Sequence, residues 1–212
     1  MTRRASAAEQ ICRYAASVHR RGLTHGRTGN ISVRLDQDRL LVTPTGSSLG
    51  DLTPDRLAVV DLAGRHLEGA APSKEAFLHA ALLRSRPHDN AVVHLHSHYA
   101  VAVSCLTGLR AEDPLPVLTP YYAMRVPRLV VLDYHAPGDR SLEPLAESLA
   151  RETAALLIRQ HGAVVAGRDL DTAADAIEEL EATARLFLEV RALPHLELEA
   201  SEAIRLRKGT SL

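Results

Sequence analysis

The sequence predicts an α/β fold in which helices flank a mixed, largely antiparallel sheet. Short apolar runs typical of strands are interleaved with longer segments whose apolar residues recur at helical spacing. The strands do not alternate regularly with helices, which disfavours a doubly wound parallel sheet. A chain of 212 residues that is 46% hydrophobic and 24% charged can bury one substantial core. We therefore expect a single domain over residues 1–212.

The first part of the chain predicts one helix and three strands. Apolar residues recur at helical spacing over residues 5–22, and Gly22 follows two arginines as a helix stop. Apolar and polar residues alternate over 31–35, as in a strand. Residues 40–43 and 57–62 are short apolar runs that also predict strands. A short polar turn joins the first two strands, so we expect them to pair with each other.

The second part predicts a helix that begins at Pro72-Ser73, with Ser73 as N-cap and Glu75 in the first turn, and that ends before Pro87. A proline-broken segment is expected at 115–126. The other expected elements are strands at 91–96, 129–132, 155–158 and 163–166, and helices at 99–106, 141–151 (with Pro144 in its first turn) and 169–190.

The composition disfavours nucleic acid and membranes as partners. A formal net charge of -1, a pI near 6.8 and dispersed basic residues leave no patch for a phosphate backbone. No apolar stretch approaches the length of a membrane span, and the N-terminus lacks the apolar core of a signal peptide. Cys12 and Cys105 have apolar neighbours and no CxxC spacing, so we expect reduced, packed thiols in a cytoplasmic protein.

Two histidines at the end of a predicted strand are candidate metal ligands. His94 and His96 are two residues apart, so on a strand they project from one face. Two imidazoles leave a divalent ion under-coordinated, and we add His161 and Glu75 as candidate ligands. Three imidazoles suit zinc, or another divalent ion, and Glu75 can act as a ligand at rest and a proton carrier during turnover. The alternative for each histidine alone is a hydrogen-bonded core residue or a surface side chain.

Three loops of small residues are candidates for an anion site. Consecutive backbone N–H groups in such turns, together with hydroxyls, form a nest for phosphate. Lys74 adds a cationic donor for a phosphate or a carboxylate. The alternative is ordinary turns and a helix cap. The candidate residues are Asn30, which ends the loop from Gly26, then Thr45 and Gly46, and finally Ser73 and Lys74.

Other patterns do not support a different chemistry. Residues 46–50 match the spacing of a serine-hydrolase elbow, but no apolar helical stripe follows, so Ser48 is expected to be a loop residue. The sequence contains neither a dinucleotide-binding glycine motif after a strand nor a P-loop. The acidic residues at 178–181 are expected to form a solvent-facing side of the last long helix.

Five motifs in register carry a resemblance to a known family. Through these motifs the chain resembles the class II aldolase/adducin family, and the resemblance extends from about residue 7 to 193. The resemblance implies an αβα sandwich around a mainly antiparallel sheet, and a homotetramer. The motifs are Gly29-Asn30-Ile31-Ser32, Thr43-Pro44-Thr45-Gly46, Pro72-Ser73-Lys74-Glu75, His94-Leu95-His96-Ser97 and His161-Gly162.

The same resemblance implies roles for the matching residues. Zinc would be held by His94, His96 and His161, and Glu75 would be the catalytic acid/base. Tyr121 or Tyr122 would reach the active site of a neighbouring subunit, or would pack at an interface. The phosphate pocket would be formed by Asn30, Thr45, Gly46, Ser73 and Lys74.

Within the family, the Pro-Ser-Lys-Glu motif and residues 103–106 and 118–122 look like the 3-oxo-tetronate 4-phosphate decarboxylase branch. The expected reaction is zinc-dependent loss of carbon dioxide from this phosphorylated sugar acid, through a metal-stabilised enediolate, to give dihydroxyacetone phosphate. One alternative is a sugar-phosphate aldolase of the fuculose-phosphate type, or an epimerase. The other is a non-catalytic adducin-like binding module, which would be expected to have lost the histidines or Glu75.

Overall fold

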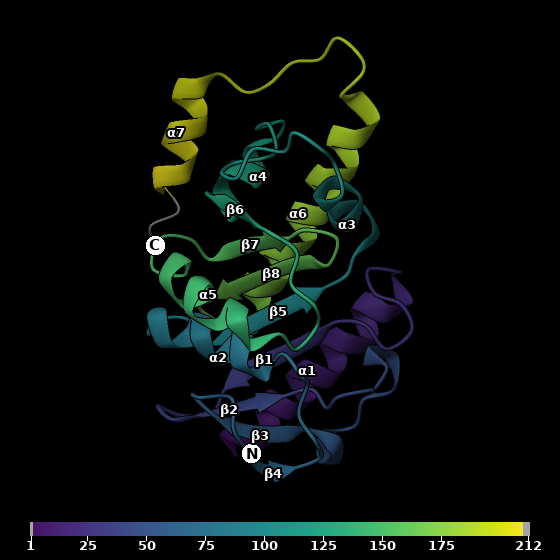
Figure 1. Ribbon diagram of the computed structural model, residues 1–212, viewed down its shortest axis with the longest axis vertical. Coiled ribbons are helices and arrows are strands. Elements are labelled where there is room, and N and C mark those ends of the chain that lie inside the picture. The colour runs from purple at the N-terminus through teal and green to yellow at the C-terminus, as the bar shows by residue number, and fades with distance from the viewer. Residues whose placement is uncertain (1, 210–212) are drawn as a thin grey trace.

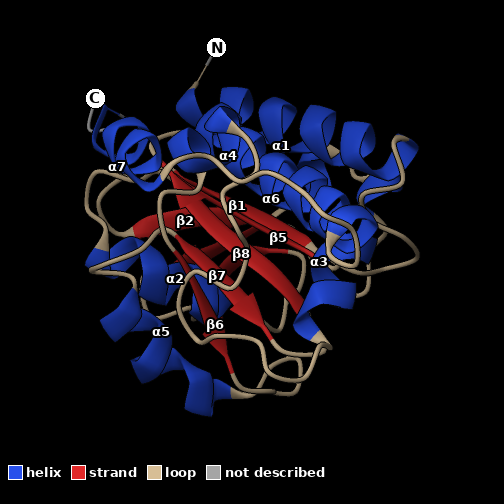
Figure 2. Cartoon of the chain, turned by 90° about the horizontal axis from the view of Figure 1, so that it is seen from above, coloured by secondary structure: helices blue, strands red, loops and turns tan. Residues whose placement is uncertain are grey.

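The computed structural model describes residues 2–209, in which one eight-stranded sheet lies between two layers of helices (Figures 1 and 2). The helices are α1 (Arg3–Arg20), α2 (Ala76–Ser85), α3 (His98–Ser104), α4 (Pro120–Arg125), α5 (Glu143–Leu149), α6 (Leu170–Val190) and α7 (Ala200–Gly209). The strands are β1 (Asn30–Arg34), β2 (Arg39–Val42), β3 (Ala58–Asp61), β4 (His66–Gly69), β5 (Ala91–Leu95), β6 (Leu129–Leu132), β7 (Ala155–Ile158) and β8 (Gly162–Gly167).

The strand order across the sheet is β4-β3-β2-β1-β5-β8-β7-β6. Neighbouring strands pair antiparallel throughout, except for the parallel pair of β6 and β7. The central strand β5 pairs with β1 on one side and β8 on the other, which places Asn30 opposite His94. The predicted α/β fold with a mainly antiparallel, mixed sheet is therefore confirmed.

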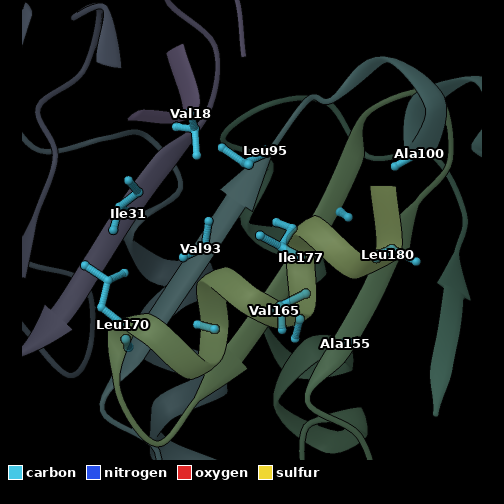
Figure 3. Close-up of a cluster of buried hydrophobic side chains, with 14 of the residues drawn as sticks. Val18, Ile31, Val93, Leu95, Ala100, Ala155, Val165, Leu170, Ile177 and Leu180 are labelled. Carbon is cyan, nitrogen blue, oxygen red and sulfur yellow. The ribbon is translucent and has the colours of Figure 1, made fainter. Parts of the chain in front are cut away.

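The alternation of side chains along β5 divides the core in two. Val93 and Leu95 pack with α1, α3 and α6 on one face of the sheet, and Figure 3 shows part of this cluster. Val92 packs with α2 and α5 on the other face. His94 is one residue from both Val93 and Leu95, so its side chain projects on the α2 side. The sheet thereby directs this histidine toward the start of α2.

The helix expected from Pro72 begins four residues later, at Ala76. Ser73 is not its N-cap: the Ser73 backbone N–H donates to the Thr43 carbonyl, and its hydroxyl accepts from the backbone N–H of Glu75. Glu75 therefore occupies the N-cap position of α2 rather than its first turn. The local sequence suits a helix start, but pairing with Thr43 and Pro44, which follow β2, keeps this segment extended.

Three regular elements were not predicted. All four residues of β4 are exposed, and the strand pairs only with β3, so its sequence lacks the alternation of a half-buried strand. The proline-broken segment contains α4, where Pro120 takes a favourable first-turn position and the Thr119 hydroxyl caps the helix. The short α7 buries only Ala203.

The two cysteines differ from each other in exposure. Both thiols are free, and Cys12 is half-buried. Cys105 is exposed because it follows the last residue of α3, which corrects the expectation that both thiols are packed. Over residues 2–209, none of the helices combines the length and the apolarity needed to span a membrane.

Candidate metal centre and adjoining loops

Four side chains from distant parts of the chain converge beside the end of β5. Glu75 precedes α2, His94 lies in β5, His96 follows β5, and His161 lies in the turn between β7 and β8. Their ligand atoms all lie within 4.8 Å of one another. The Nε2 atom of His94 is 3.1 Å from that of His96 and 3.4 Å from that of His161. One ion can therefore contact all four side chains.

The backbone helps to place two of the four side chains. His94 is fully buried, and its Nδ1 lies 2.8 Å from the Ala163 carbonyl oxygen. Because a carbonyl only accepts, Nδ1 carries a proton, which leaves Nε2 as the nitrogen that faces the cluster and can bind a cation. Gly162 allows the turn that carries His161 to approach β5, since a Cβ there would lie 2.4 Å from the Leu95 oxygen. A glycine at position 162 is thus a steric requirement of the site.

The Glu75 carboxylate spans the cluster. Oε2 lies 3.4 Å from Nε2 of His94, and Oε1 lies 3.2 Å from Nε2 of His161. The Asn30 amide donates to Oε2 at 2.9 Å. Burial alone would raise the pKa of Glu75, but the two neighbouring imidazoles outweigh it and lower that pKa below its ordinary value. Glu75 is therefore a buried carboxylate at neutral pH.

The state of His96 also suits a metal ligand. Burial, together with the neighbouring His94, lowers the pKa of His96 to about 3, so its ring is neutral at neutral pH. A neutral imidazole offers the lone pair that a metal ion needs. Three imidazole nitrogens and one carboxylate form a donor set of the kind that binds zinc and similar divalent ions. The chemistry of the residues present therefore fits such a cation.

Two of the three predicted anion loops lie side by side. Pro44 and Pro72 form an isolated antiparallel bridge, and the Thr45 N–H donates to the Ala71 carbonyl at 2.9 Å. This pairing brings Thr45 and Gly46 next to Ser73 and Lys74, which directly precede Glu75. Thr45, Gly46 and Lys74 are exposed to solvent. Gly46 has φ +68°, a conformation that favours glycine.

The third predicted anion loop, which ends at Asn30, contacts the histidine cluster instead of the other two loops. Gly29, at φ +82°, packs against β5, where a Cβ would lie 3.0 Å from the His94 oxygen. This approach places the side chain of Asn30 inside the cluster, where its amide contacts Glu75. The Asn30 Oδ1 atom is buried and has no hydrogen-bond partner among the described residues. Asn30 is thus in direct contact with the carboxylate.

A pocket of about 340 Å³ adjoins the cluster at two of its histidines. His96 and His161 form part of its wall, and exposed His25, His98 and Gln160 line it as well. Gln160 adopts the left-handed region at φ +54°, which is unusual for a residue other than glycine. A small molecule can therefore reach the imidazoles from this side.

The two candidate tyrosines have different environments. Tyr122 is only 1% exposed and belongs to the core of its own chain, so it is not available to a neighbouring subunit. Tyr121 is 58% exposed and lies beside the Arg125 guanidinium. Any cross-subunit role therefore falls to Tyr121.

Sequence reasoning missed two buried polar residues near the site. The expectation that residues 178–181 face solvent is wrong for Glu181, which is 7% exposed. Its spacing from Ile177 and Ala184 places it on the buried side of α6, so helical periodicity would have found it. His79 lies one turn after Glu75 on α2 and is fully buried, and its Nδ1 lies 2.8 Å from the Ser32 hydroxyl. The residues around His79 in α2 are apolar, so the local sequence does not indicate a functional role for this histidine.

His79 predicts a pH dependence of stability. Burial lowers its pKa from 6.5 to about 3, so the folded protein keeps it neutral while the unfolded chain takes up a proton below 6.5. Stability is therefore lost as the pH falls through this window, by about 2 kcal/mol from this residue between about pH 7.5 and about pH 5. This is measured by urea unfolding of the metal-free protein at both pH values. Over that change, we expect the free energy of unfolding of His79→Asn to fall by about 2 kcal/mol less than that of the parent. An equal loss in both proteins would contradict the assignment.

The comparisons with known proteins agree with this geometry. The profile of the Class II Aldolase and Adducin N-terminal domain family matches residues 9–188. The chain belongs to this family. The predicted resemblance is thus confirmed, and the metal cluster and the loop pair both lie within the matched range.

Several relatives are similar over most of their length. The chain is 47% identical over 179 residues to the 3-oxo-tetronate 4-phosphate decarboxylase of Haemophilus influenzae, covering 84% of this chain and 85% of that protein. It is 34% identical over 189 residues to an Escherichia coli L-fuculose phosphate aldolase, covering 88% and 84%. The structure of Klebsiella pneumoniae YgbL matches with a TM-score of 0.94 and 40% identity, covering 98% of this chain and all of that one. The expectation of a lyase of this family agrees with these relatives.

Proposed function

We propose that this chain is a metal-dependent carbon–carbon lyase that converts a 3-oxo-tetronate 4-phosphate to dihydroxyacetone phosphate and carbon dioxide. The observation that carries the proposal is the Glu75 carboxylate, which lies among three imidazoles and directly follows the paired loops. The retention of all four cluster residues argues against a non-catalytic binding module.

His94, His96 and His161 would hold the cation, with Glu75 as a further ligand before substrate binds. A divalent cation such as Zn²⁺, when bound there, would supply Lewis acidity that stabilises the negative charge developing on oxygen. Burial and the neighbouring His94 keep the His96 imidazole neutral, and the Ala163 carbonyl orients the ring of His94. The site is thus prepared to bind a cation at neutral pH.

Glu75 would deliver the proton that the reaction consumes. Loss of carbon dioxide breaks the bond between carbons 1 and 2, and the electron pair passes into an enediolate that must gain one proton at carbon 2. At rest, contacts with His94 and His161 keep Glu75 ionised. Once substrate separates the carboxylate from these contacts, burial favours the protonated acid. Glu75 can then take up a proton and donate it, while the Asn30 amide orients its Oε2.

The paired loops would bind the phosphate. Thr45, Gly46 and Ser73 offer hydroxyls and backbone N–H groups close together, and the exposed Lys74 ammonium adds a positive charge. Asn30 would contribute from inside the cluster, where its Oδ1, unpartnered within residues 2–209, can accept from a substrate hydroxyl. This placement sets the phosphate beside the proton donor.

The relatives favour decarboxylation over aldol cleavage. Relatives named 3-oxo-tetronate 4-phosphate decarboxylase reach 47% identity in H. influenzae and 42% in E. coli K12, against 34% for an L-fuculose phosphate aldolase. Aldol cleavage would use the same cation and the same carboxylate, so the metal cluster does not discriminate between the reactions. Lys74 supports the sugar-acid substrate, because its ammonium can pair with a carboxylate.

We propose a homotetrameric, cytoplasmic enzyme whose partner is its small phosphorylated substrate. The exposed aromatic Tyr121 and the exposed Leu193 and Leu196 support a subunit interface. Sedimentation equilibrium tests the assembly. A mass of four chains is expected, and a monomer at micromolar concentration would contradict it.

The reaction is tested with two substrates. Zinc-loaded protein is incubated with 3-oxo-tetronate 4-phosphate or with fuculose 1-phosphate, and carbon dioxide and aldehyde are measured. We expect carbon dioxide from the first substrate and little aldehyde from the second. Aldehyde release without carbon dioxide would replace the decarboxylase proposal with the aldolase alternative.

A further inference from the structure

His96 is held less firmly by its own contacts than His94 is. The strand β5 ends at Leu95 and α3 begins at His98, so His96 lies in the connection between them. Apart from the contact with Nε2 of His94, its ring makes no hydrogen bond within residues 2–209. By contrast, His94 lies within the strand, and its Nδ1 binds a backbone carbonyl. The position of His96 therefore depends on how its backbone is held.

The Glu181 carboxylate binds the backbone just beyond His96. Oε2 accepts from the Ser97 hydroxyl at 2.8 Å and from the Ala100 N–H at 2.7 Å, and Oε1 accepts from the Tyr99 N–H at 2.9 Å. Ser97 does not cap α3 with its own side chain, so Glu181 satisfies these first N–H groups instead. Both oxygens of a buried carboxylate are thus used to hold one short connection.

The helix that carries Glu181 gives this contact a rigid base. Ile177 and Leu180 of α6 belong to the same buried cluster as Leu95 and Ala100, which flank the connection (Figure 3). Leu180 is the residue next to Glu181, and it is 1% exposed. Movement of the carboxylate away from Ser97 would therefore require α6 itself to shift within a packed core.

We propose that Glu181 is a positioning residue for the metal centre: by fixing Ser97, Tyr99 and Ala100, it holds His96 where its Nε2 can bind the cation. The inference rests on the proposed function, because it requires that the cluster binds a metal ion. Residues that hold a ligand in place typically contribute 10–100-fold to metal affinity.

The test compares Co²⁺ binding by the parent, Glu181→Gln and the control Glu178→Gln. Glutamine keeps the shape of Glu181 but places an NH₂ group against N–H donors. We expect about 10–100-fold weaker Co²⁺ binding and a changed Co²⁺ absorption spectrum at saturation, since a displaced His96 alters the ligand field. Glu178 lies on the same helix, where it pairs with Arg21, and its variant should bind as the parent does.

The outcomes separate the two proposals. If the parent binds no Co²⁺, the proposed metal-dependent function is wrong, and the positioning role falls with it. If the parent binds but folded Glu181→Gln shows the parent's affinity and spectrum, the positioning role is wrong. Should Glu181→Gln not fold, Ser97→Ala replaces it, because this change removes one hydroxyl donor and leaves the carboxylate in place. Parental affinity and spectrum in that variant would also overturn the inference.

Discussion

Replacing Glu75 with glutamine is expected to reduce turnover by about 10²–10⁴-fold, the usual contribution of a positioned acid or base. The amide cannot carry the proton to carbon 2, yet it keeps the size of the side chain and an oxygen near the imidazoles. The fold and most of the metal should therefore remain. Steady-state carbon dioxide release, metal content and circular dichroism of the same preparation measure the three properties.

Glu68→Gln is the matched control, because Glu68 is an exposed carboxylate of β4 that pairs with Arg4. This variant should keep the parent's turnover. If Glu75→Gln turned over at the parent's rate with its metal bound, Glu75 would have no part in proton transfer. If it lost its metal altogether, Glu75 would be chiefly a ligand.

Replacing His94 with alanine is expected to weaken metal binding by more than about 100-fold, beyond what loss of a supporting contact costs. The Nε2 atom of His94 lies within 3.4 Å of a ligand atom of every other member of the cluster. Its loss also leaves the buried Ala163 carbonyl without the side-chain donor, which adds about 1–3 kcal/mol of destabilisation. Elemental analysis after dialysis and urea unfolding measure the two effects.

His98→Ala is the control for this experiment. His98 shares the spacing of the pair, two residues beyond His96, but it is exposed and lies outside the cluster of ligand atoms. Its variant should retain the parent's metal content. Equal metal content in the His94→Ala and His98→Ala proteins would show that the cluster is not the metal site.

Local spacing predicted the part of the site that lies on one strand. The separation of His94 and His96 indicated a shared face, and the structure brings both rings to one point. Their meeting with Glu75 and His161 depends on the sheet order, which pairs β5 with β8 and directs His94 toward α2. Spacing alone does not reveal that order, so the full set also relied on coordination chemistry and family motifs.

Tertiary contacts decided the features that sequence patterns predicted incorrectly. Ser73 is a favourable residue for a helix cap, but its backbone pairs with Thr43, the residue after β2, and α2 begins later. Tyr121 and Tyr122 are adjacent and chemically alike, and only the packing of α4 determines which one is buried. Glu181 looked like part of an acidic surface because its neighbours Glu178 and Glu179 are also acidic. Its helical spacing from the apolar residues of α6 predicts instead that its side chain is buried.

The most direct test of the proposed mechanism is carbon dioxide release from 3-oxo-tetronate 4-phosphate by one preparation in three states: as loaded with zinc, after complete chelation, and after return of one equivalent of zinc per chain. Release in the first state, loss of release in the second and recovery in the third are expected. Unchanged release from verified metal-free protein, or no release from the fully loaded protein, would contradict a decarboxylase centred on Glu75 and the three histidines.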